Sequence, residues 1–334
     1  MVLSIIIPNR NGKDLLRNCL NSIYTHPPIC EYEIIVVDDA SRDGSPEMVK
    51  KEFSKIPVIV NQENCGFAYS TNRGIEKSRG KYILLLNNDT LALENSLNSL
   101  IEFMDKNSYV DICGCKLLSE NGILHRSTQT FPKVSREFFH ANPIFKKLYG
   151  GEESLSHRAL FFFLNIFKTQ WASFIDYNKT TEVDMITGAV FMFRRVLIDK
   201  IGLLDENFFM YSEEADYCYR LKKSGGRVYY YPAASIIHLL GQTTKQDFKK
   251  GYWIANPFLI ERYKSMLYFF KKHYSRMRFY LLKSVILEGH SLRWGINALK
   301  WLFCVKKRDG IKEVMDIYRA VIKLTLRYRW SAKE

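Results

Sequence analysis

The stretch Tyr82-Ile-Leu-Leu-Leu-Asn-Asn-Asp89 decides the fold, because five apolar residues stop abruptly at three polar ones. An apolar run without alternation is typical of a strand that is buried on both faces of a parallel sheet. Residues 3–8 have the same character, and residues 33–37 end likewise at Asp38 and Asp39. We therefore expect buried central strands that end in polar side chains.

Helical segments separate these runs. Apolar residues recur at helical spacing over residues 15–23, and further helices are expected over 45–53, 68–78 and 94–104. Ser45 followed by Pro46 fits an N-cap with proline at the first helical position. Shorter strands are expected over 58–60 and 110–115. This alternation predicts the α/β class with a mostly parallel, doubly wound sheet.

The second half of the chain is less regular. Residues 159–167 are strongly apolar and fit either a helix beneath a loop or a flap that meets a substrate. A strand over 185–193, an acidic loop over 211–216, a helix over 217–223 and a strand over 228–231 follow. From about Lys245 the chain reads as amphipathic helices.

The charge of the chain is concentrated at one end. The 334 residues are 47% hydrophobic and 25% charged, which is a globular composition. Residues 245–334 hold 21 Lys and Arg against 7 Asp and Glu, an excess equal to the whole-chain net charge of +14. A basic block with interleaved aromatics can bind anionic lipid or nucleic acid. No nucleic-acid motif is present, so no nucleic-acid partner is expected.

The cysteines and the apolar segments suggest a compartment. Seven scattered cysteines without a CxxC pair indicate free or buried thiols in a reducing environment. The chain enters a strand at once without a signal peptide, and no apolar window reaches the ~18 residues of a spanning helix. We expect a cytoplasmic protein that lies peripherally on the inner face of the cell membrane.

Polar residues at the strand ends are the first candidates for chemistry, because ligands of such sheets bind beyond the carboxyl ends of the strands. A carboxylate at Asp38 or Asp39 can accept hydrogen bonds from a pyrimidine or a ribose. Both also fit a polar strand end that leads into a turn. Asp89 can hold Mg²⁺ or Mn²⁺, which prefer oxygen ligands. Its alternative role is a turn that caps the next helix.

Two further candidates lie later in the chain. His238 ends an apolar run and fits either a structural histidine or a metal ligand that joins Asp89. Glu213 and Glu214 are adjacent, and their repulsion raises one pKa toward that of a useful base. A cluster of acids is also typical of a solvated helix start.

Taken together, these segments resemble the family 2 glycosyltransferases, which have a GT-A fold. Three stretches within residues 3–243 carry the resemblance: residues 4–11 with 36–41, residues 64–72 with 84–90, and residues 188–238. The third is especially similar to a rhamnosyltransferase-like branch, whose enzymes use dTDP-L-rhamnose to build bacterial surface polysaccharides. The expected fold is thus a doubly wound mixed sheet flanked by helices, with a C-terminal amphipathic helical extension.

The resemblance implies roles for individual residues. Donor binding is implied for Pro8, Asn9, Arg10, Asp38, Asp39, Asn64, Gly66, Asn72, Asn87 and Asn88. Asp89 and His238 would bind Mn²⁺ or Mg²⁺, Glu214 would be the catalytic base, and Gly188, Tyr211 and Asp216 would meet the acceptor. The family's DxD motif is reduced here to Asn-Asn-Asp, and its Glu-Asp pair is Glu213-Glu214. Glu213 therefore competes for the role of base, and Glu214 is favoured.

These inferences give a domain plan. Residues 1–244 would form the catalytic domain, with a nucleotide-binding half over 1–118 and an acceptor-binding half over 119–244, and residues 245–334 would be the basic extension. The expected reaction is inverting transfer from a dTDP- or UDP-sugar to a lipid-linked or glycan acceptor. A non-catalytic nucleotide-sugar-binding subunit is the alternative of another class.

The extension has two interpretations. It would bind an anionic membrane through its basic residues together with Phe269, Phe270, Trp294 and Trp301. Alternatively, it packs on the catalytic domain or forms a homodimer.

Overall fold

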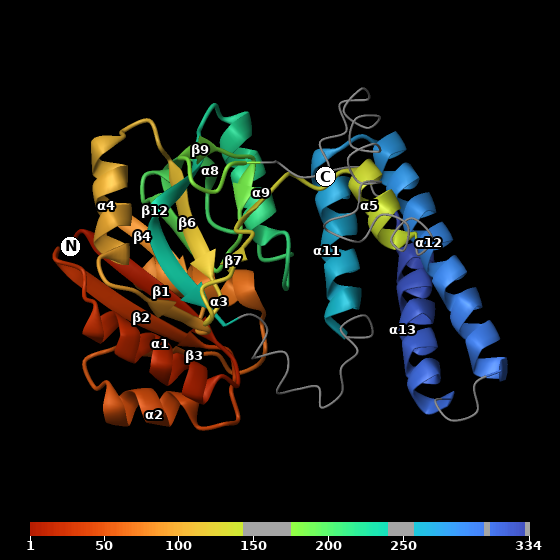
Figure 1. Cartoon of the computed structure of the whole chain (residues 1–334), viewed down its shortest axis with the longest axis horizontal. Helices are drawn as coiled ribbons and strands as arrows, with labels where there is room; N and C mark the ends of the chain where they lie inside the picture. Colours follow the sequence, from red (N-terminus) through yellow and green to blue (C-terminus); the bar gives the residue numbers. More distant parts are fainter. Residues whose placement is uncertain (143–174, 240–256, 304–307, 331–334) are drawn as a thin grey trace. The chain divides into compact units, whose positions relative to one another are not determined.

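The computed structural model describes residues 1–142, 175–239, 257–303 and 308–330 (Figure 1). These residues form two compact units, of which the first holds residues 1–131, 175–209 and 213–239. The second unit holds residues 132–142, 210–212, 257–303 and 308–330. The apolar stretch 159–167 lies outside the described residues.

The first unit is built on a ten-stranded sheet in the order β3-β2-β1-β4-β11-β6-β12-β5, with β7 beside β6 and β9 beside β12. A separate pair joins β8 and β10. The strands are β1 (Leu3–Asn9), β2 (Tyr32–Asp38), β3 (Val58–Val60), β4 (Tyr82–Leu86), β5 (Thr90–Ala92), β6 (Ile112–Leu118), β7 (Leu124–His125), β8 (Thr128–Gln129), β9 (Thr181–Glu182), β10 (Met185–Ile186), β11 (Val190–Arg194) and β12 (Val228–His238).

Strand direction places the polar strand ends together. β1, β2, β3 and β4 are mutually parallel, as are β6 and β12, whereas β11 runs antiparallel between β4 and β6. The carboxyl ends of the parallel strands therefore share one edge with the amino end of β11. We call this the carboxyl edge. It carries Asn9, Asp38, residues 87–89, residues 188–189 and His238. The observed mixed sheet confirms the predicted fold class.

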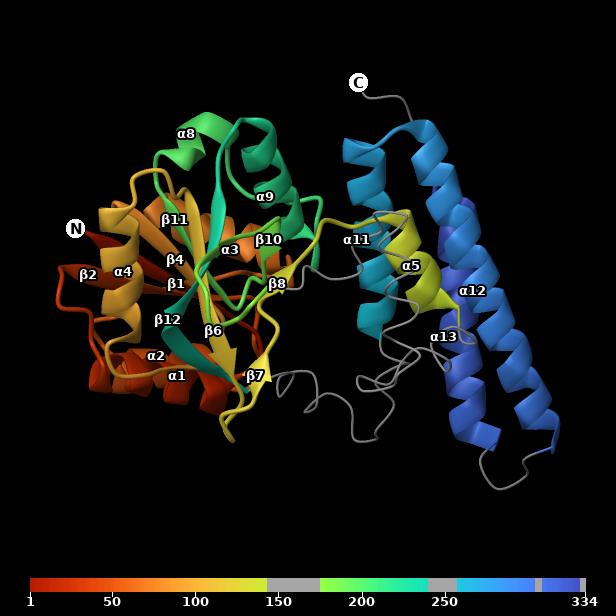
Figure 2. The same cartoon turned by 45° about the horizontal axis from the view of Figure 1, so that its top comes forward.

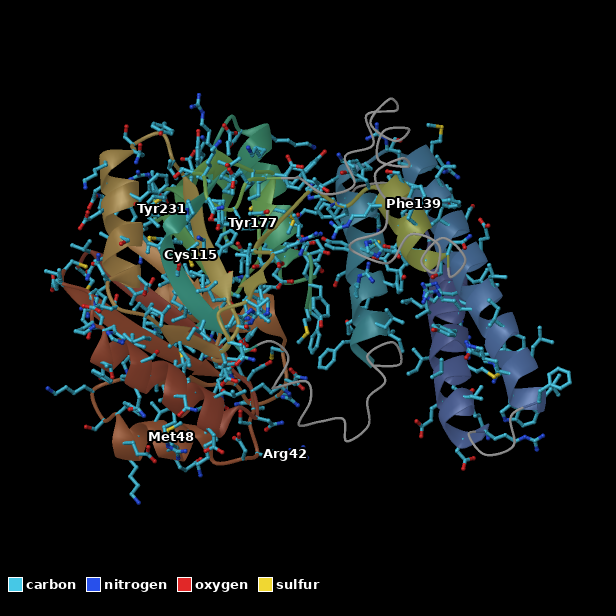
Figure 3. The ribbon with its side chains drawn as sticks, in the orientation of Figure 1. Arg42, Met48, Cys115, Phe139, Tyr177 and Tyr231 are labelled. Atoms are coloured by element: carbon cyan, nitrogen blue, oxygen red, sulfur yellow. The ribbon has the colours of Figure 1, made fainter. Side chains whose placement is uncertain are left out.

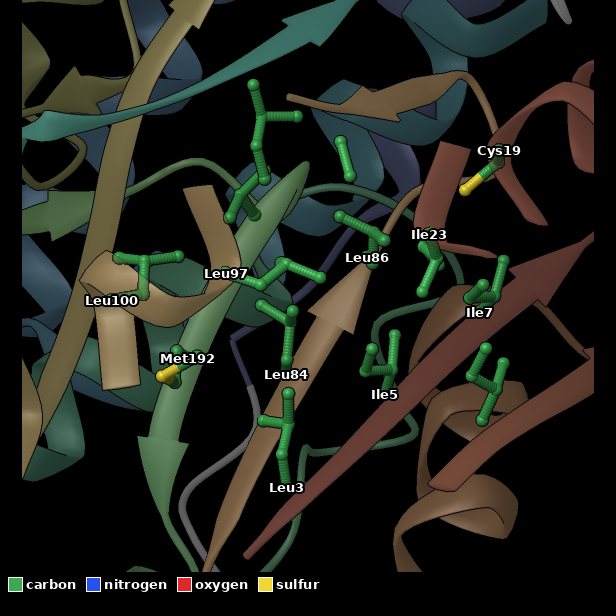
Figure 4. Close-up of a cluster of buried hydrophobic side chains, with 14 of the residues drawn as sticks. Leu3, Ile5, Ile7, Cys19, Ile23, Leu84, Leu86, Leu97, Leu100 and Met192 are labelled. Carbon is green, nitrogen blue, oxygen red and sulfur yellow. The ribbon is translucent and has the colours of Figure 1, made fainter. Parts of the chain in front are cut away.

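Six of the described helices belong to the first unit: α1 (Lys13–Thr25), α2 (Ser45–Glu52), α3 (Phe67–Lys77), α4 (Ser96–Lys106), α8 (Leu197–Ile201) and α9 (Glu213–Lys223). The buried face of α1 is the predicted stripe, from Leu15 to Ile23. Figure 4 shows Leu97 and Leu100 of α4 over Leu84 of β4 and Met192 of β11. This apolar layer supports the strands whose ends carry the polar residues.

Several local predictions were wrong. The acidic residues expected in a loop form the first turn of α9, which begins at Glu213. Asp89 leads into β5, which was not predicted, so the turn 87–89 does not cap a helix. The strand expected over 185–193 is split into β10 and β11. Ser45 is the first helical residue of α2, and Gly44, with φ +78°, occupies the N-cap instead.

The described cysteines are all free thiols, as predicted, and Cys304 lies outside the described residues. Cys115 is buried in β6, where Figure 3 labels it. Burial raises the pKa of Cys115 to about 12 and that of Cys19 to about 12. Both thiols thus stay protonated at neutral pH and act as small apolar core groups.

The second unit is helical, with α5 (Val134–Ala141), α11 (Pro257–His273), α12 (Arg276–Phe303) and α13 (Arg308–Arg327). Figures 1 and 2 both show α5 against α12. The contact needs a glycine, because a Cβ on Gly289 would lie 2.5 Å from the Cβ of Ala141. Among the described helices, none combines the length and apolarity needed to cross a bilayer.

The aromatic residues assigned to a membrane interface divide into two groups. Phe269 and Phe270 are fully buried within the helical unit, so the prediction that they enter a membrane was wrong. Trp294 is half-buried, and Trp301 is exposed. The amphipathic pattern located the apolar face of α11, but neighbouring helices cover that face.

Candidate active site

Three strand ends are joined by a buried polar network. Asn88 donates from Nδ2 to Oδ1 of Asn9 at 2.6 Å, and Asn9 donates from its own Nδ2 to Oδ2 of Asp38 at 2.9 Å. The backbone N–H of Ser41 donates to Oδ1 of Asp38 at 2.8 Å. These contacts keep β1, β2 and β4 in register at the carboxyl edge. Asn9, Asp38 and Asn88 thus bond to one another beneath the surface that a donor would meet.

Asp39 is held by donors on both carboxylate oxygens. Oδ1 accepts from Nδ2 of Asn61 at 2.8 Å and from the backbone of Cys65 at 2.9 Å, and Oδ2 accepts from the backbone of Gly66 at 2.9 Å. Arg10 donates to the backbone oxygen of Asp39 at 2.6 Å. Asn61 was missed by the sequence reasoning, although it directly follows β3 as Asp39 follows β2.

The remaining donor candidates differ in accessibility. Arg10 and Asn64 are exposed, and Pro8 and Asn87 are half-buried, so these four side chains can reach a ligand. Gly66 and Asn72 are buried. Donor contacts near Asp39 would therefore come from the accessible residues, with the buried ones shaping the backbone beneath them.

The two proposed metal ligands meet at the carboxyl edge. Nε2 of His238 lies 3.2 Å from Oδ1 of Asp89, although 149 positions separate them in the chain. The pairing of β12 with β5 sets His238 opposite Thr90, the neighbour of Asp89. Oδ1 of Asp89 and Nδ1 of His238 are buried and make no hydrogen bond. Apart from the 3.2 Å contact with Nε2 of His238, Oδ1 of Asp89 has no nearby donor, and a cation would relieve the cost of burying it.

These residues fit a divalent cation as part of its shell. Mg²⁺ and Mn²⁺ accept carboxylate oxygen, and imidazole nitrogen suits the softer of the two. Within the described parts of the chain, no group of three or more His, Cys, Asp or Glu side chains could hold a metal ion. Asp89 and His238 would thus supply two ligands, and diphosphate oxygens and water would supply the others.

The carboxylate pair opens helix α9. Glu213 is buried and Glu214 is half-buried, and Oε2 of each is buried without a hydrogen bond. Burial raises the pKa of both carboxyls, and the charge of Glu214 raises the pKa of Glu213 further. The more accessible Glu214 is therefore the better placed of the two to exchange a proton with a ligand.

The pair connects to the metal candidates through the start of β11. The backbone N–H of Gly188 bonds to Glu214, and a Cβ on Gly188 would lie 3.9 Å from Oε1 of Glu214. The next residue, Ala189, accepts a hydrogen bond from the backbone of Asn87 at 3.0 Å. One short backbone path therefore joins the strand end of Asp89 to the carboxylate of Glu214.

The residues predicted to bind the acceptor do not all lie beside Glu214. Gly188 lies beside Glu214, as described. Asp216 is fully buried and pairs with Arg220 at 2.8 Å, so its carboxylate already has a partner inside the protein. Tyr211 is exposed, belongs to the helical unit and packs its ring edge-on against Phe258. Tyr211 and Ser212 both have positive φ, which is a strained conformation directly before α9.

Comparison with models of known protein families identifies the family of this chain. The model described as Glycosyl transferase family 2 matches residues 4–202. The chain belongs to this family. The matched residues of this family 2 glycosyltransferase include the donor candidates and Asp89. They end before Glu213, Glu214 and His238, so the roles of those three rest on the geometry.

Individual relatives agree with this assignment. The N-acetylglucosaminyl-diphospho-decaprenol L-rhamnosyltransferase of Mycobacterium tuberculosis is 21% identical over 239 residues, covering 68% of this chain and 71% of that protein. The uncharacterized glycosyltransferase YfnE of Bacillus subtilis is 31% identical over 116 residues, and the match covers 34% of this chain but 30% of YfnE. This glycosyltransferase therefore aligns with less than a third of YfnE.

A solved structure supports the fold. The crystal structure of GalNAc-T7 with UDP, GalNAc and Mn²⁺ aligns with a TM-score of 0.54 at 15% identity, covering 81% of this chain and 48% of that chain. At this identity the likeness establishes the shared GT-A architecture.

Proposed function

We propose that this glycosyltransferase moves a sugar with inversion from a nucleotide-sugar to a lipid-linked or polysaccharide acceptor in bacterial surface glycan synthesis. The preferred donor is dTDP-L-rhamnose, and a UDP-hexose is the second candidate. The observation that carries the proposal is the meeting of Asp89, His238 and the Glu214 carboxylate along one backbone path at the carboxyl edge. The named activity of the M. tuberculosis relative supports rhamnose and a lipid-linked acceptor.

The donor would lie along the carboxyl edge. Arg10 and Asn64 are exposed beside Asp39, where they can bind the nucleotide. A divalent cation held by Asp89 and His238 would neutralise charge that develops on the diphosphate leaving group. The buried network of Asn9, Asp38 and Asn88 keeps the strand ends in position, so little reorganisation is needed as the bond breaks.

Glu214 would act as the general base. The acceptor hydroxyl oxygen attacks the anomeric carbon, the bond from that carbon to the diphosphate oxygen breaks, and the hydroxyl proton passes to Glu214. Attack from the face opposite the leaving group inverts the anomeric centre. Glu213 is the more buried carboxyl and carries the more strongly raised pKa, so it keeps its proton while Glu214 ionises.

Donor hydrolysis by the purified protein tests the proposal. dTDP- and UDP-sugars are offered with Mn²⁺ or Mg²⁺, and released nucleotide diphosphate is measured. We expect metal-dependent release from dTDP-rhamnose, lost in Asp89→Ala and retained in the control Asp14→Ala, which changes an exposed aspartate. A UDP-hexose as the best donor would replace rhamnose. Tight nucleotide-sugar binding without turnover, even with acceptor glycans present, would favour the non-catalytic subunit.

We further infer that the helical unit attaches the enzyme to an anionic membrane through the end of α12. Four apolar residues are exposed there: Leu299, Trp301, Leu302 and Phe303. Arg308 lies 5.0 Å above the Trp301 ring, which combines a cation with an aromatic group as membrane interfaces favour. These residues replace Phe269 and Phe270 as the expected membrane contacts.

Flotation with phosphatidylglycerol vesicles tests the attachment. We expect wild-type protein to float at low salt and Leu302→Ser/Phe303→Ser to stay at the bottom, with Ile29→Ser, an exposed site in the first unit, as control. Light scattering tests the alternative. A dimer that the double variant dissociates, without vesicle binding by the wild type, would assign the same residues to a homodimer.

A further inference from the structure

Asn72 of α3 forms hydrogen bonds to the loop that precedes α9. We call residues 202–209, between α8 and α9, the latch loop. Nδ2 of Asn72 donates to the carbonyl oxygen of Leu204 and to Oε1 of Glu206, each at 2.9 Å. The backbone N–H of Leu204 donates back to Oδ1 of Asn72 at 3.1 Å. Asn72 is 2% exposed, and its side-chain amide forms its hydrogen bonds with a loop 132 positions away in the chain.

The same loop is held from its other side by Arg220 of α9. Arg220 donates from Nη2 to the carbonyl oxygen of Leu203 at 2.7 Å and from Nη1 to that of Ile201. Its Nε pairs with Asp216, which lies two residues after Glu214 in the first turn of α9. Adjacent residues of the latch loop are therefore bonded to α3 on one side and to α9 on the other.

A second connection runs from the donor pocket to the end of the loop. Oδ2 of Asp39 accepts from the backbone of Gly66, and the next N–H, of Phe67, donates to the carbonyl oxygen of Phe209 at 2.8 Å. Gly66 has φ +90°, and a Cβ there would lie 2.3 Å from that same carbonyl oxygen. No other residue fits this close approach without displacing Phe209.

From these contacts we propose that the latch loop couples the donor side of the site to the general base, with Asn72 and Arg220 as positioning residues. The inference rests on the proposed role of Glu214. A general base must lie within hydrogen-bond reach of its proton, and a misplacement of ~1 Å costs on the order of 10²-fold in rate. Asn72 acts on α9 through the latch loop, and Arg220 joins that loop to α9 directly.

Kinetics of two variants test the coupling. Asn72→Ala removes the hydrogen bonds from α3 to the latch loop. Arg220→Lys keeps a positive charge beside Asp216 but loses the hydrogen bonds from the guanidinium group to the loop. We expect kcat for transfer to fall about 10²-fold in each, with the Kd of the nucleoside diphosphate in calorimetry within about threefold of wild type. Glu76→Ala, on the exposed face of α3, is the control and should keep the wild-type rate.

A pH profile separates positioning from simple loss of folded protein. If the base moves relative to its surroundings, the acid limb of kcat shifts in Asn72→Ala, whereas fewer active molecules would lower the curve without moving it. An unshifted limb, an unchanged kcat, or a loss of nucleotide affinity that accounts for the whole defect overturns the coupling. Glu214→Gln is measured in parallel. Full activity in that variant would refute the base assignment, whatever Asn72→Ala does.

Discussion

Two buried glutamates, one in each unit, have opposite environments. Glu137 of α5 is 2% exposed and accepts hydrogen bonds from Tyr263 at 2.6 Å and from Arg262 at 3.0 Å. Glu213 of α9 is 5% exposed, and its Oε2 has no hydrogen-bond partner. Their burial is nearly equal, so burial alone does not distinguish them. The two glutamates differ in the hydrogen-bond donors that surround them.

The difference separates a structural carboxylate from a chemical one. Two donors compensate the desolvation of Glu137, which therefore links α5 to α11. Oε2 of Glu213 and Oε2 of Glu214 lack hydrogen-bond partners, and the two carboxyls are buried beside each other, so one of them is driven to keep a proton. Buried carboxyls with perturbed pKa values cluster at functional sites, where the energetic cost of burying them is kept because the reaction needs them.

The largest effect is expected at Glu214. Glu214→Gln removes the base while preserving shape, and we expect kcat for transfer to fall by about 10²- to 10⁴-fold. Nucleoside diphosphate binding should not change, because the amide leaves the carboxyl edge intact. Steady-state kinetics with Glu182→Gln, an exposed glutamate of the same unit, provide the comparison. Near-normal turnover in Glu214→Gln would show that Glu214 is not the base and that the carboxylates of α9 are not chemical in the sense that separates them from Glu137.

The corresponding change in the helical unit should affect stability instead. Glu137→Gln weakens the contacts with Tyr263 and Arg262, and we expect the free energy of unfolding to fall by about 1–3 kcal/mol. Urea denaturation measures the loss, with the exposed Glu288→Gln as control. Donor hydrolysis at low temperature should stay at the wild-type rate. A selective loss of hydrolysis in the folded variant would mean that Glu137 is more than a structural link.

A further effect concerns the pH dependence of stability. Because the folded-state pKa of Glu213 is raised, the folded protein binds more protons than the unfolded chain, and stability falls as pH rises from the ordinary glutamate pKa through the raised one. Glu213→Gln stays neutral, so its advantage over wild type should grow with pH, by at most about 1.4 kcal/mol per pH unit. Thermal unfolding across pH 4–8 measures this trend. A constant difference would show that folding does not raise the pKa of Glu213.

The sequence was most informative where geometry follows from strand direction. Asp39 and Asp89 were found because the carboxyl ends of parallel strands must share an edge. The contact of His238 with Asp89 depends on β5, a three-residue strand too short to leave a pattern. Asn61 was missed although the strand that it follows, β3, was predicted over the same residues.

Other features depend on what covers a surface. Phe269 and Phe270 were assigned to a membrane because their helix is amphipathic, yet periodicity does not reveal whether lipid or protein meets the apolar face. The hydrogen bonds of Asn72 span 132 positions, and no local pattern encodes so distant a partner. Pairings of this kind need the three-dimensional structure.

The position of β11 has a consequence for how the protein is made. This strand lies between β4 and β6, which precede it by more than seventy residues, so a nascent chain without it exposes two unpaired strand edges. The strands β1–β4 pair with one another directly, but they join β6 in one sheet only after the ribosome has delivered residues 190–194. A fragment that stops at residue 131 keeps the donor-side strands β1–β4 but should aggregate when expressed alone.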